Sequence, residues 1–551
     1  MSPVGRFFKN SREVLSRPQS NVFSAAVVIS LTYFASMLVG IWRERIFAAT
    51  FFNCCKSQTD VFIAASRFPE MIFQLIVVGS LSAAFIPVFS HYLTKDEDEA
   101  YNIASSLINF LFIVFILLAG IIFIFSFPFS KSITGHNFNL GQLVLMSQMT
   151  RVMLFVQFFF LISSFFAAIS QSKRRFLLPS LSPIIYNISV ILCISFFSGM
   201  FGIWSAVLGM LIGSFLHLTI QIPLVFKLGF RLKFAFDFKH PGFKKILKLM
   251  FPRTLGLAAD QVQATTAVFF ATSLLSGSLT MYNLAQKLAD LPVRLLGTSI
   301  GQAALPVLAS QLAEGKIDDF KNTIKKSLNQ IFYLSLPATC LFLVLRVQLV
   351  RLAYGAKTFP WEATINTGKT LAAITFSIFS QCAIQLLVRG FYALHNTVTP
   401  FVIGLSSVLV NIILSWIFIF VLKTEIFGLA LAYSISNLIN FVFLFFFFNR
   451  KEKIVDRSVL LPWGKMLLIS ITSGIVSWIS MRFMDENVFD TSKTIHLLFL
   501  TGISGGLGLG TYVLLSIIFK LEELRVFLSL LRKIGGWRKS LFSVTEIIEP
   551  H

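Results

Sequence analysis

Long apolar segments fill almost all of this 551-residue chain, and several of them contain Arg, Lys, Asp or Glu. A membrane-spanning helix needs about 20 apolar residues, because the hydrocarbon core of a bilayer is about 30 Å thick. A charged side chain at that depth costs about 2.5 to 3.5 kcal/mol, and it usually faces a water-filled cavity or a partner. The pattern therefore predicts an all-α polytopic membrane protein with a polar path through it.

The apolar segments predict about 14 transmembrane helices. The first segment is too long for the apolar core of a cleavable signal peptide, so we expect it to remain in the protein. The predicted spans are 22–50, 60–94, 101–129, 142–171, 176–199, 202–227, 245–274, 278–311, 322–348, 365–393, 399–422, 427–449, 462–483 and 495–519.

The composition argues against other classes of protein. Only 13% of the residues are charged, whereas soluble domains have about 25%. The net charge of +22 comes from short Lys and Arg clusters between the apolar segments, with no basic groove interleaved with aromatic residues, so nucleic-acid binding is not expected. The five cysteines and seven histidines show no metal-ligand spacing, and no cofactor is predicted. The adjacent Cys54 and Cys55 are a candidate redox pair, but a plain short-loop position is favoured.

The basic clusters also predict the topology. They precede the first span and follow spans four, six, eight, twelve and fourteen, whereas the alternate loops hold isolated charges such as Lys131 and Lys423. Under the positive-inside rule, both termini are cytoplasmic.

Spans one to six resemble spans seven to twelve. Arg67-Phe-Pro-Glu70 in span two matches Lys287-Leu-Ala-Asp290 in span eight, at an offset near 220 residues. Six crossings return the chain to its starting side, so the halves are parallel repeats, and transporters built in this way bind substrate between the halves. The predicted parts are an N-terminal lobe at 1–230, a C-terminal lobe at 231–455, two extra helices at 456–519 and a basic cytoplasmic tail at 520–551.

The charges inside the spans have two interpretations. Arg67 and Glu70 lie three residues apart on one helical face, and this pair either forms an internal salt bridge or lines a cavity. Recurrence of the pattern at Lys287 and Asp290 favours a cavity there. On span seven, Asp260 is the candidate for ion coupling, although a polar helix face packed against a neighbour is the plainer explanation.

Three sequence blocks resemble the MurJ (MviN) family of lipid II flippases. They are Gly40-Ile-Trp-Arg43-Glu-Arg45, the segment from Thr59 to Pro69, and the segment from Gly79 to Ser90. The resemblance covers essentially the whole chain. It implies the fold of the multidrug/oligosaccharidyl-lipid/polysaccharide exporters, with a cationic central cavity for the diphosphate and sugar headgroup of lipid II.

The resemblance carries individual site positions onto this chain. It places cavity cations at Arg43 and Lys287 and acids at Glu44, Asp60 and Asp290. At two positions where the family usually has arginine, this chain has Met37 and Phe73. The full set of candidate site residues is Arg43, Arg45, Arg67, Arg253 and Lys287 as substrate-binding cations, Glu44, Asp60, Glu70 and Asp290 as cavity or gating acids, and Asp260 for ion coupling.

The resulting hypothesis is a lipid II flippase of the bacterial cytoplasmic membrane that works by alternating access. The expected partners are lipid II, the bilayer and the cell-wall synthesis machinery. The first alternative is a flippase for another polyprenyl-linked oligosaccharide or amphiphile, because Met37 and Phe73 remove two cations. The second is a membrane enzyme such as a polyprenyl-phosphate glycosyltransferase, which would need an Asp-rich or paired-carboxylate motif on a sizeable loop, and none is present.

Overall fold

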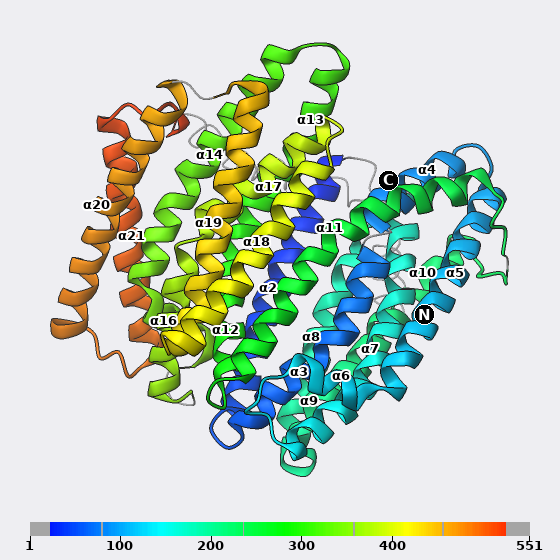
Figure 1. Cartoon of the computed structure of the whole chain (residues 1–551), viewed down its shortest axis with the longest axis horizontal. Coiled ribbons are helices and arrows are strands. Elements are labelled where there is room, and N and C mark those ends of the chain that lie inside the picture. The colour runs from blue at the N-terminus through cyan, green and yellow to red at the C-terminus, as the bar shows by residue number, and fades with distance from the viewer. Residues whose placement is uncertain (1–21, 79–80, 235, 356–358, 455–456, 525–551) are drawn as a thin grey trace, which may run out of the picture. The chain divides into compact units, whose positions relative to one another are not determined.

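The computed structural model describes residues 22–78, 81–234, 236–355, 359–454 and 457–524, and it contains helices and no strand within these ranges (Figure 1). The all-α class predicted from the sequence is therefore confirmed. The elements up to α11 are α2 (Val22–Phe51), α3 (Lys56–Phe73), η1 (Gln74–Val78), η2 (Leu81–Phe85), α4 (Ile86–Leu93), α5 (Glu97–Ile124), α6 (Ser126–Ile133), α7 (Leu140–Ser172), α8 (Leu177–Phe201), α9 (Trp204–Thr219), α10 (Ile222–Lys227) and α11 (Pro241–Thr272). The later ones are α12 (Ser278–Pro292), η3 (Val293–Thr298), α13 (Ser299–Ala313), α14 (Ile317–Val344), α15 (Arg346–Tyr354), α16 (Trp361–Thr375), α17 (Ile378–Ala393), α18 (Val398–Trp416), η4 (Ile417–Val421), α19 (Glu425–Glu452), α20 (Arg457–Asn487) and α21 (Thr494–Ile518).

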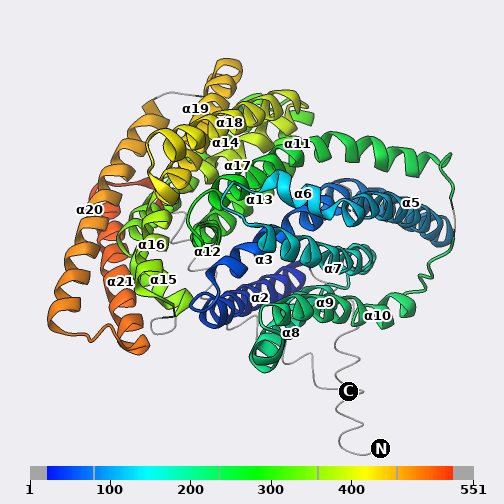
Figure 2. The same cartoon turned by 60° about the horizontal axis from the view of Figure 1, so that its bottom comes forward.

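The chain forms two compact units. The first consists of Met1–Leu284, Ala353–Asn366 and Val408–Leu429, and the second of Ala285–Leu352, Thr367–Ser407 and Ala430–His551. In the first unit α8 packs against α2 and α9, and α7 packs against α3 and α9 (Figure 2). In the second, α14 packs against α17 and α20, and α20 lies beside α21.

Polar residues at the helix starts explain where two long helices begin. The α7 helix starts with a capping box, in which Asn139 and Gln142 exchange side-chain to backbone hydrogen bonds of 2.8 and 2.9 Å. At the start of α5, the Asp96 carboxylate accepts from the backbone N–H groups of Asp98 and Glu99. These contacts satisfy backbone donors that a helix cannot pair internally.

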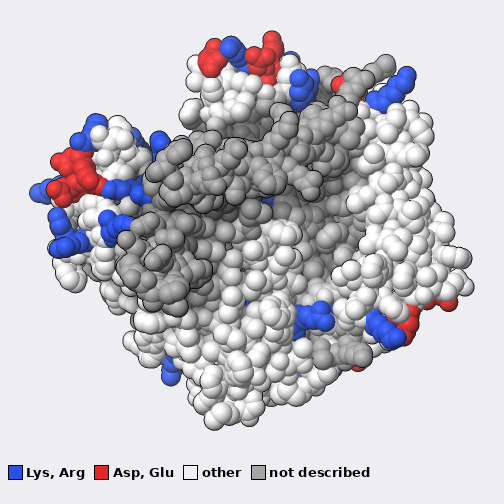
Figure 3. Space-filling model, turned by 180° about the vertical axis from the view of Figure 1, so that it is seen from behind, with Lys and Arg blue, Asp and Glu red and all other residues white. Residues whose placement is uncertain are grey.

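Each predicted span falls on one helix or on consecutive helices. By length and composition, ten described helices can cross a membrane, or eleven if the bent pair α16 and α17 is one span. The other three predicted spans coincide with α2, the segment from α3 to α4, and α11, which carry many of the ionisable candidates. Figure 3 shows a visible face whose described surface is mostly uncharged, with Lys, Arg, Asp and Glu gathered in a few small groups.

Three helical segments in the described chain contain π-helical turns. In the first unit, η1 and η2 interrupt the segment from α3 to α4, and η4 ends the segment that begins with α18. In the second unit, η3 joins α12 to α13. The η1 turn starts at Gln74 and η3 at Val293, so their starts differ by nearly the offset that relates the two repeats. Such turns are rare and are often found at functional sites.

Candidate functional site

Arg43 lies on α2, and residues of α2 and α8 hold its guanidinium. Nη1 donates a hydrogen bond of 3.1 Å to Asn187 Oδ1, and Nη2 pairs with the carboxylate of Glu44. The guanidinium carbon lies 5.7 Å from the centre of the Tyr186 ring, within range of a cation–π interaction. The side chain is 24% exposed. Glu44 thus balances the charge of Arg43, and an anionic ligand would have to compete with it.

Close packing of α8 on α9 fixes the position of Tyr186. A Cβ atom built on Gly213 of α9 would lie 2.9 Å from both the ring and the carbonyl oxygen of Tyr186, and one on Gly209 would lie 2.8 Å from the Val190 backbone. Small residues four apart permit such close approach of membrane helices. The position of the Tyr186 ring next to Arg43 therefore depends on glycine at position 213.

We expect the substitution Gly213→Ala to lower the free energy of unfolding by about 1 to 3 kcal/mol, because it overpacks this contact. The measurement is denaturant unfolding of the purified protein in detergent. Gly120→Ala is the matched control, since its Cβ would meet nothing within 4 Å. Equal stability of the two variants would contradict this account of the packing.

Arg67 lies on α3 and binds α11. Its Nε donates to Thr265 Oγ1 at 3.2 Å and its Nη2 to the Gln261 carbonyl oxygen at 3.1 Å and to the Gln261 side-chain oxygen. Glu70, one turn further along α3, interacts with Arg67 electrostatically, but the two make no ion-pair contact in the described chain. Arg67 is therefore a half-buried cation whose described hydrogen-bond partners are all neutral.

A cavity of about 510 Å³ lies next to this contact within the first unit, and Gln261 and Thr265 form part of its wall. The rest is mainly apolar side chains of α3, α6, α11 and α18, among them Met71, Phe269 and Phe270. Its size is typical of ligand pockets, which are about 300 to 1,000 Å³. The lining suits hydrocarbon better than a sugar or a diphosphate.

Asp60 fastens α3 to the start of α12. Its carboxylate accepts hydrogen bonds from the backbone N–H groups of Gly277 and Thr280, at 2.6 and 2.8 Å, and from Thr280 Oγ1 at 2.6 Å. The side chain is only 2% exposed. Gly277 has a φ of +94°, and a Cβ there would lie 2.9 Å from the ring of Phe52. The turn thus requires glycine, and the buried carboxylate caps the helix that follows it.

The candidates on α12 belong to the second unit from Ala285 onward. Lys287 is exposed, and Asp290 pairs with Arg294 at 3.7 Å. Arg294 was not among the predicted site residues, although it lies one helical turn after Asp290. Arg43 and Lys287 lie in different units, so the cavity proposed to hold both cations stays a prediction.

For the remaining candidates, the structure mainly gives the exposure of the side chain. Arg45 is half-buried on α2, and Asp260 is exposed on α11. Arg253 also lies on α11, but its side chain is outside the described part of the chain. At the two substituted arginine positions, Met37 is half-buried, and the ring of Phe73 lies 6.1 Å from that of Phe160.

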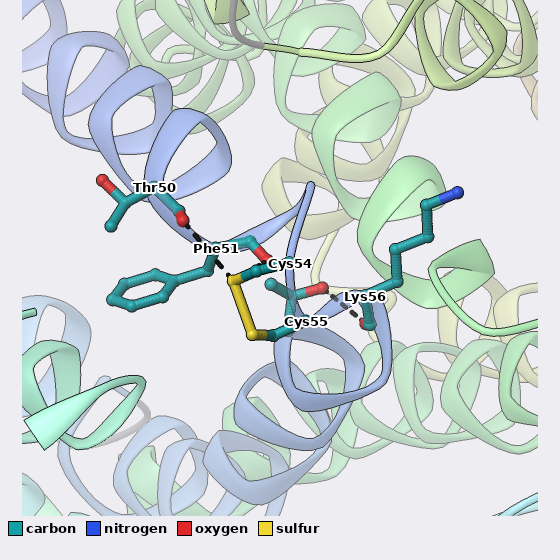
Figure 4. The surroundings of a disulfide bond; sticks show 6 residues. Thr50, Phe51, Cys54, Cys55 and Lys56 are labelled. Carbon is teal, nitrogen blue, oxygen red and sulfur yellow. Dashed lines mark hydrogen bonds between the residues drawn. A yellow bond between two sulfur atoms is a disulfide. The ribbon is translucent and has the colours of Figure 1, made fainter. Parts of the chain in front are cut away.

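Cys54 and Cys55 lie in the short turn between α2 and α3, as the sequence predicted, and the structure joins them in a disulfide (Figure 4). Cys54 Sγ lies 3.8 and 3.5 Å from the carbonyl oxygens of Thr50 and Phe51. The next turn begins α3, where Thr59 Oγ1 donates to the Lys56 carbonyl oxygen at 2.7 Å. The pair therefore lies one turn before the buried Asp60.

Comparison with known proteins identifies the family. The model of the family described as "Lipid II flippase MurJ" matches residues 47–498, which is most of the chain. The chain belongs to the MurJ lipid II flippase family. Members of this family are transporters rather than enzymes, and the family and the many apolar helices make this a multi-pass inner-membrane protein.

Individual MurJ relatives match over most of their length. A probable lipid II flippase MurJ from Buchnera aphidicola subsp. Acyrthosiphon pisum is 27% identical over 88% of this chain and 96% of that protein. The corresponding Thermotoga maritima protein is 26% identical over 91% of this chain and 98% of that protein.

Solved structures confirm the predicted exporter fold. Lipid II flippase MurJ in an inward closed conformation superposes with a TM-score of 0.72, at 24% identity over 90% of this chain and 98% of that chain. An inward-facing multidrug resistance MATE transporter of the MOP superfamily gives 0.60, at 13% identity over 78% of this chain and 98% of that chain. The chain therefore shares its fold with both a MurJ and a MATE structure.

Proposed function

We propose that this chain moves lipid II from the inner to the outer leaflet of the cytoplasmic membrane by alternating access, without covalent chemistry. The observation that carries the proposal is the cationic site on α2, in a chain that belongs to the MurJ family. Arg43 presents a guanidinium held in one orientation by Asn187 and Tyr186. A guanidinium matches the oxygens of a diphosphate in a forked geometry.

The Glu44 carboxylate gives this site a way to respond to cargo. In the described arrangement, Glu44 neutralises Arg43. A diphosphate that binds Arg43 replaces Glu44 as its counter-ion and frees that carboxylate for another partner. A ligand shifts a conformational equilibrium only through its different affinity for the two states, and this exchange of partners supplies such a difference. Arg45, Arg67 and Lys287 are proposed to add cationic character along the path.

A lipid-linked oligosaccharide with a different headgroup is the second candidate cargo. The specific observation in its favour is that Met37 and Phe73 stand at two positions where the MurJ family usually has arginine. The Phe73 ring packs near that of Phe160, so this position is apolar. A headgroup with less negative charge would need fewer cations.

The orientation and the division into lobes are also proposals. The alternating basic loops support cytoplasmic termini, but residues 1–21 and 525–551, with their basic clusters, lie outside the described residues. The lobe boundaries at 230 and 455, the extra helices at 456–519 and the contact with cell-wall synthesis machinery remain predictions.

Alanine substitutions at Arg43 and Lys287 test the cationic site. Losing a charge-assisted hydrogen bond to cargo costs about 1.5 to 3 kcal/mol, which corresponds to a fall in transport of at least about tenfold. We therefore expect Arg43→Ala and Lys287→Ala each to fail to support growth of a flippase-depleted strain while the protein is still made. Lys493→Ala, at an exposed loop lysine, is the control. Normal growth with both cavity variants would reject the assignment.

An assay of lipid II headgroup accessibility at the outer surface, in cells that carry only this transporter, separates the two cargoes. Transport of lipid II supports the main proposal. Two results together support the second candidate. Growth requires another flippase for lipid II, and this transporter moves a different polyprenyl-linked oligosaccharide.

A further inference from the structure

The connection between α10 and α11 contains residues 231–239, which we call the strap, and its described residues, 231–234 and 236–239, lie outside helices. All of these described residues are exposed. Apolar and polar residues alternate except at Ala235: Leu232, Phe234, Phe236 and Phe238 are apolar, whereas Arg231, Lys233, Asp237 and Lys239 are polar. Where a chain is extended, successive side chains point to opposite sides, so this pattern favours one apolar and one mainly basic face.

Polar side chains of α5 hold the backbone of the strap in place. Asn109 Nδ2 donates to the carbonyl oxygen of Lys233 at 2.8 Å, and the Ser105 hydroxyl accepts from the Lys233 N–H at 3.3 Å. Further along, the Ser106 hydroxyl accepts from the Asp237 N–H at 3.2 Å. All three side chains of α5 are buried. The strap backbone is therefore a fixed part of the fold. Of its exposed side chains, Lys233 also donates a hydrogen bond from Nζ to Asn102 Oδ1 of α5 at 3.4 Å.

Both ends of the strap are also fixed within the first unit. Before it, Tyr101 donates a hydrogen bond to the carbonyl oxygen of Leu228. After it, His240 Nε2 lies 2.9 Å from the Glu99 carboxylate. The Phe238 ring packs 5.4 Å from the buried ring of Phe243 on α11. The Phe236 ring in turn lies 5.9 Å from that of Phe238, whereas Phe234 is almost fully exposed.

The apolar side chains of the strap are unusually open for a connection between helices. Phe234 is 94% exposed, and Leu232, Phe236 and Phe238 are each exposed by 45% or more. Aromatic and basic residues together are typical of the membrane–water interface, where rings enter the headgroup region and cations meet lipid phosphates. The strap has this composition within nine residues.

The charges around the strap leave cations available for a ligand. Two nearby acids are occupied within the protein, since Glu97 pairs with Lys173 and Glu99 with His240. Within the strap, the Asp237 carboxylate accepts a hydrogen bond from the Lys239 N–H at 3.2 Å. By contrast, several basic side chains make no ion pair or hydrogen bond with a described residue: Arg231, Lys239, Lys244, Lys245 and Lys248. This surplus complements an anionic surface.

We propose that the strap is a binding site for anionic bilayer phospholipids. Phe234 and Phe236 enter the acyl boundary of the leaflet that faces them, and Arg231, Lys233 and Lys239 bind lipid phosphates. The proposal concerns resident lipid rather than cargo, so it does not depend on the flippase function. The proposal predicts that anionic lipid slows hydrogen exchange of the strap backbone along α5.

The test measures backbone hydrogen exchange in residues 229–240 of the full chain in nanodiscs. One set contains phosphatidylglycerol with phosphatidylcholine, and the other phosphatidylcholine alone. Each basic residue near an anionic leaflet strengthens binding by up to about fivefold, so we expect exchange about tenfold slower with phosphatidylglycerol. The triple variant Arg231→Gln, Lys233→Gln, Lys239→Gln should lose this difference. The matched control neutralises three exposed lysines elsewhere, Lys131 on α6 and Lys423 and Lys493 in loops, and should keep it.

Two further arms make the result decisive. Phe234→Ser with Phe236→Ser should weaken the protection in both lipid mixtures, because it removes the apolar anchor and keeps the charge. Inorganic phosphate added to phosphatidylcholine nanodiscs should leave the exchange rate unchanged. Equal exchange in the two lipid mixtures, protection by free phosphate, or a triple variant that behaves like the unaltered chain would each overturn the proposal.

Discussion

Replacing Asp60 with alanine is expected to lower the free energy of unfolding by about 3 kcal/mol or more. The substitution leaves the N–H groups of Gly277 and Thr280 and the Thr280 hydroxyl without their acceptor at a buried site. Each unsatisfied buried donor costs about 1 to 3 kcal/mol. Because α12 also carries Lys287 and Asp290, we expect transport to be lost as well.

Denaturant unfolding in detergent and complementation of a flippase-depleted strain measure the two effects. Asp60→Asn should be intermediate, because one oxygen can still accept from Thr280 while the amide group faces the Gly277 N–H. Asp490→Ala is the control: this exposed carboxylate accepts one backbone hydrogen bond, from Ser492, in a loop. Stability of Asp60→Ala equal to that of Asp490→Ala would show that the buried cap is unimportant.

Replacing Arg67 with methionine is expected to reduce transport at least about tenfold and to lower the free energy of unfolding by about 1 kcal/mol or more. The charge costs about 2.5 to 3.5 kcal/mol at membrane depth. Its three hydrogen bonds, two to Gln261 and one to Thr265, return more than this, since bonds to a charged group contribute about 1.5 to 3 kcal/mol each. The arginine therefore stabilises the contact with α11, and we expect its charge to serve transport as well.

Comparing stability with transport separates this account from a structural one. Arg67→Lys keeps the charge but loses the fork that binds α11 at two residues, so it should retain part of the transport. Arg482→Met is the control, because Arg482 forms an exposed pair with Glu486 on α20 that contributes about 0 to 1 kcal/mol. Transport by Arg67→Lys no higher than that by Arg67→Met would contradict the prediction that the charge serves transport.

The transmembrane pattern was predictable because hydropathy is a local property. Every predicted span coincides with one or more helices of the described chain, including the spans that contain charged residues. The breaks inside spans were not predictable, because a π-helical turn such as η1 has no apolar pattern that distinguishes it from an α-helical one. The same applies to the bend between α16 and α17, which the sequence analysis treated as one span.

The candidate site was predictable in its ionisable residues but not in their partners. Arg43 and Asn187 are 144 residues apart, and nothing in either segment indicates that they meet. Asp60 bonds to Thr280, 220 residues further along, a spacing close to the repeat offset, but neither segment indicates the contact by itself.

The π-helical turns η1 and η3 set the direction of the side chains that follow them. They start at Gln74 and Val293, at similar places in the two predicted repeats. A π-helical turn bonds i to i+5 and so holds one residue more than an α-helical turn. The side chains beyond each turn therefore lie on a different helix face from the one that an uninterrupted α-helix would give them.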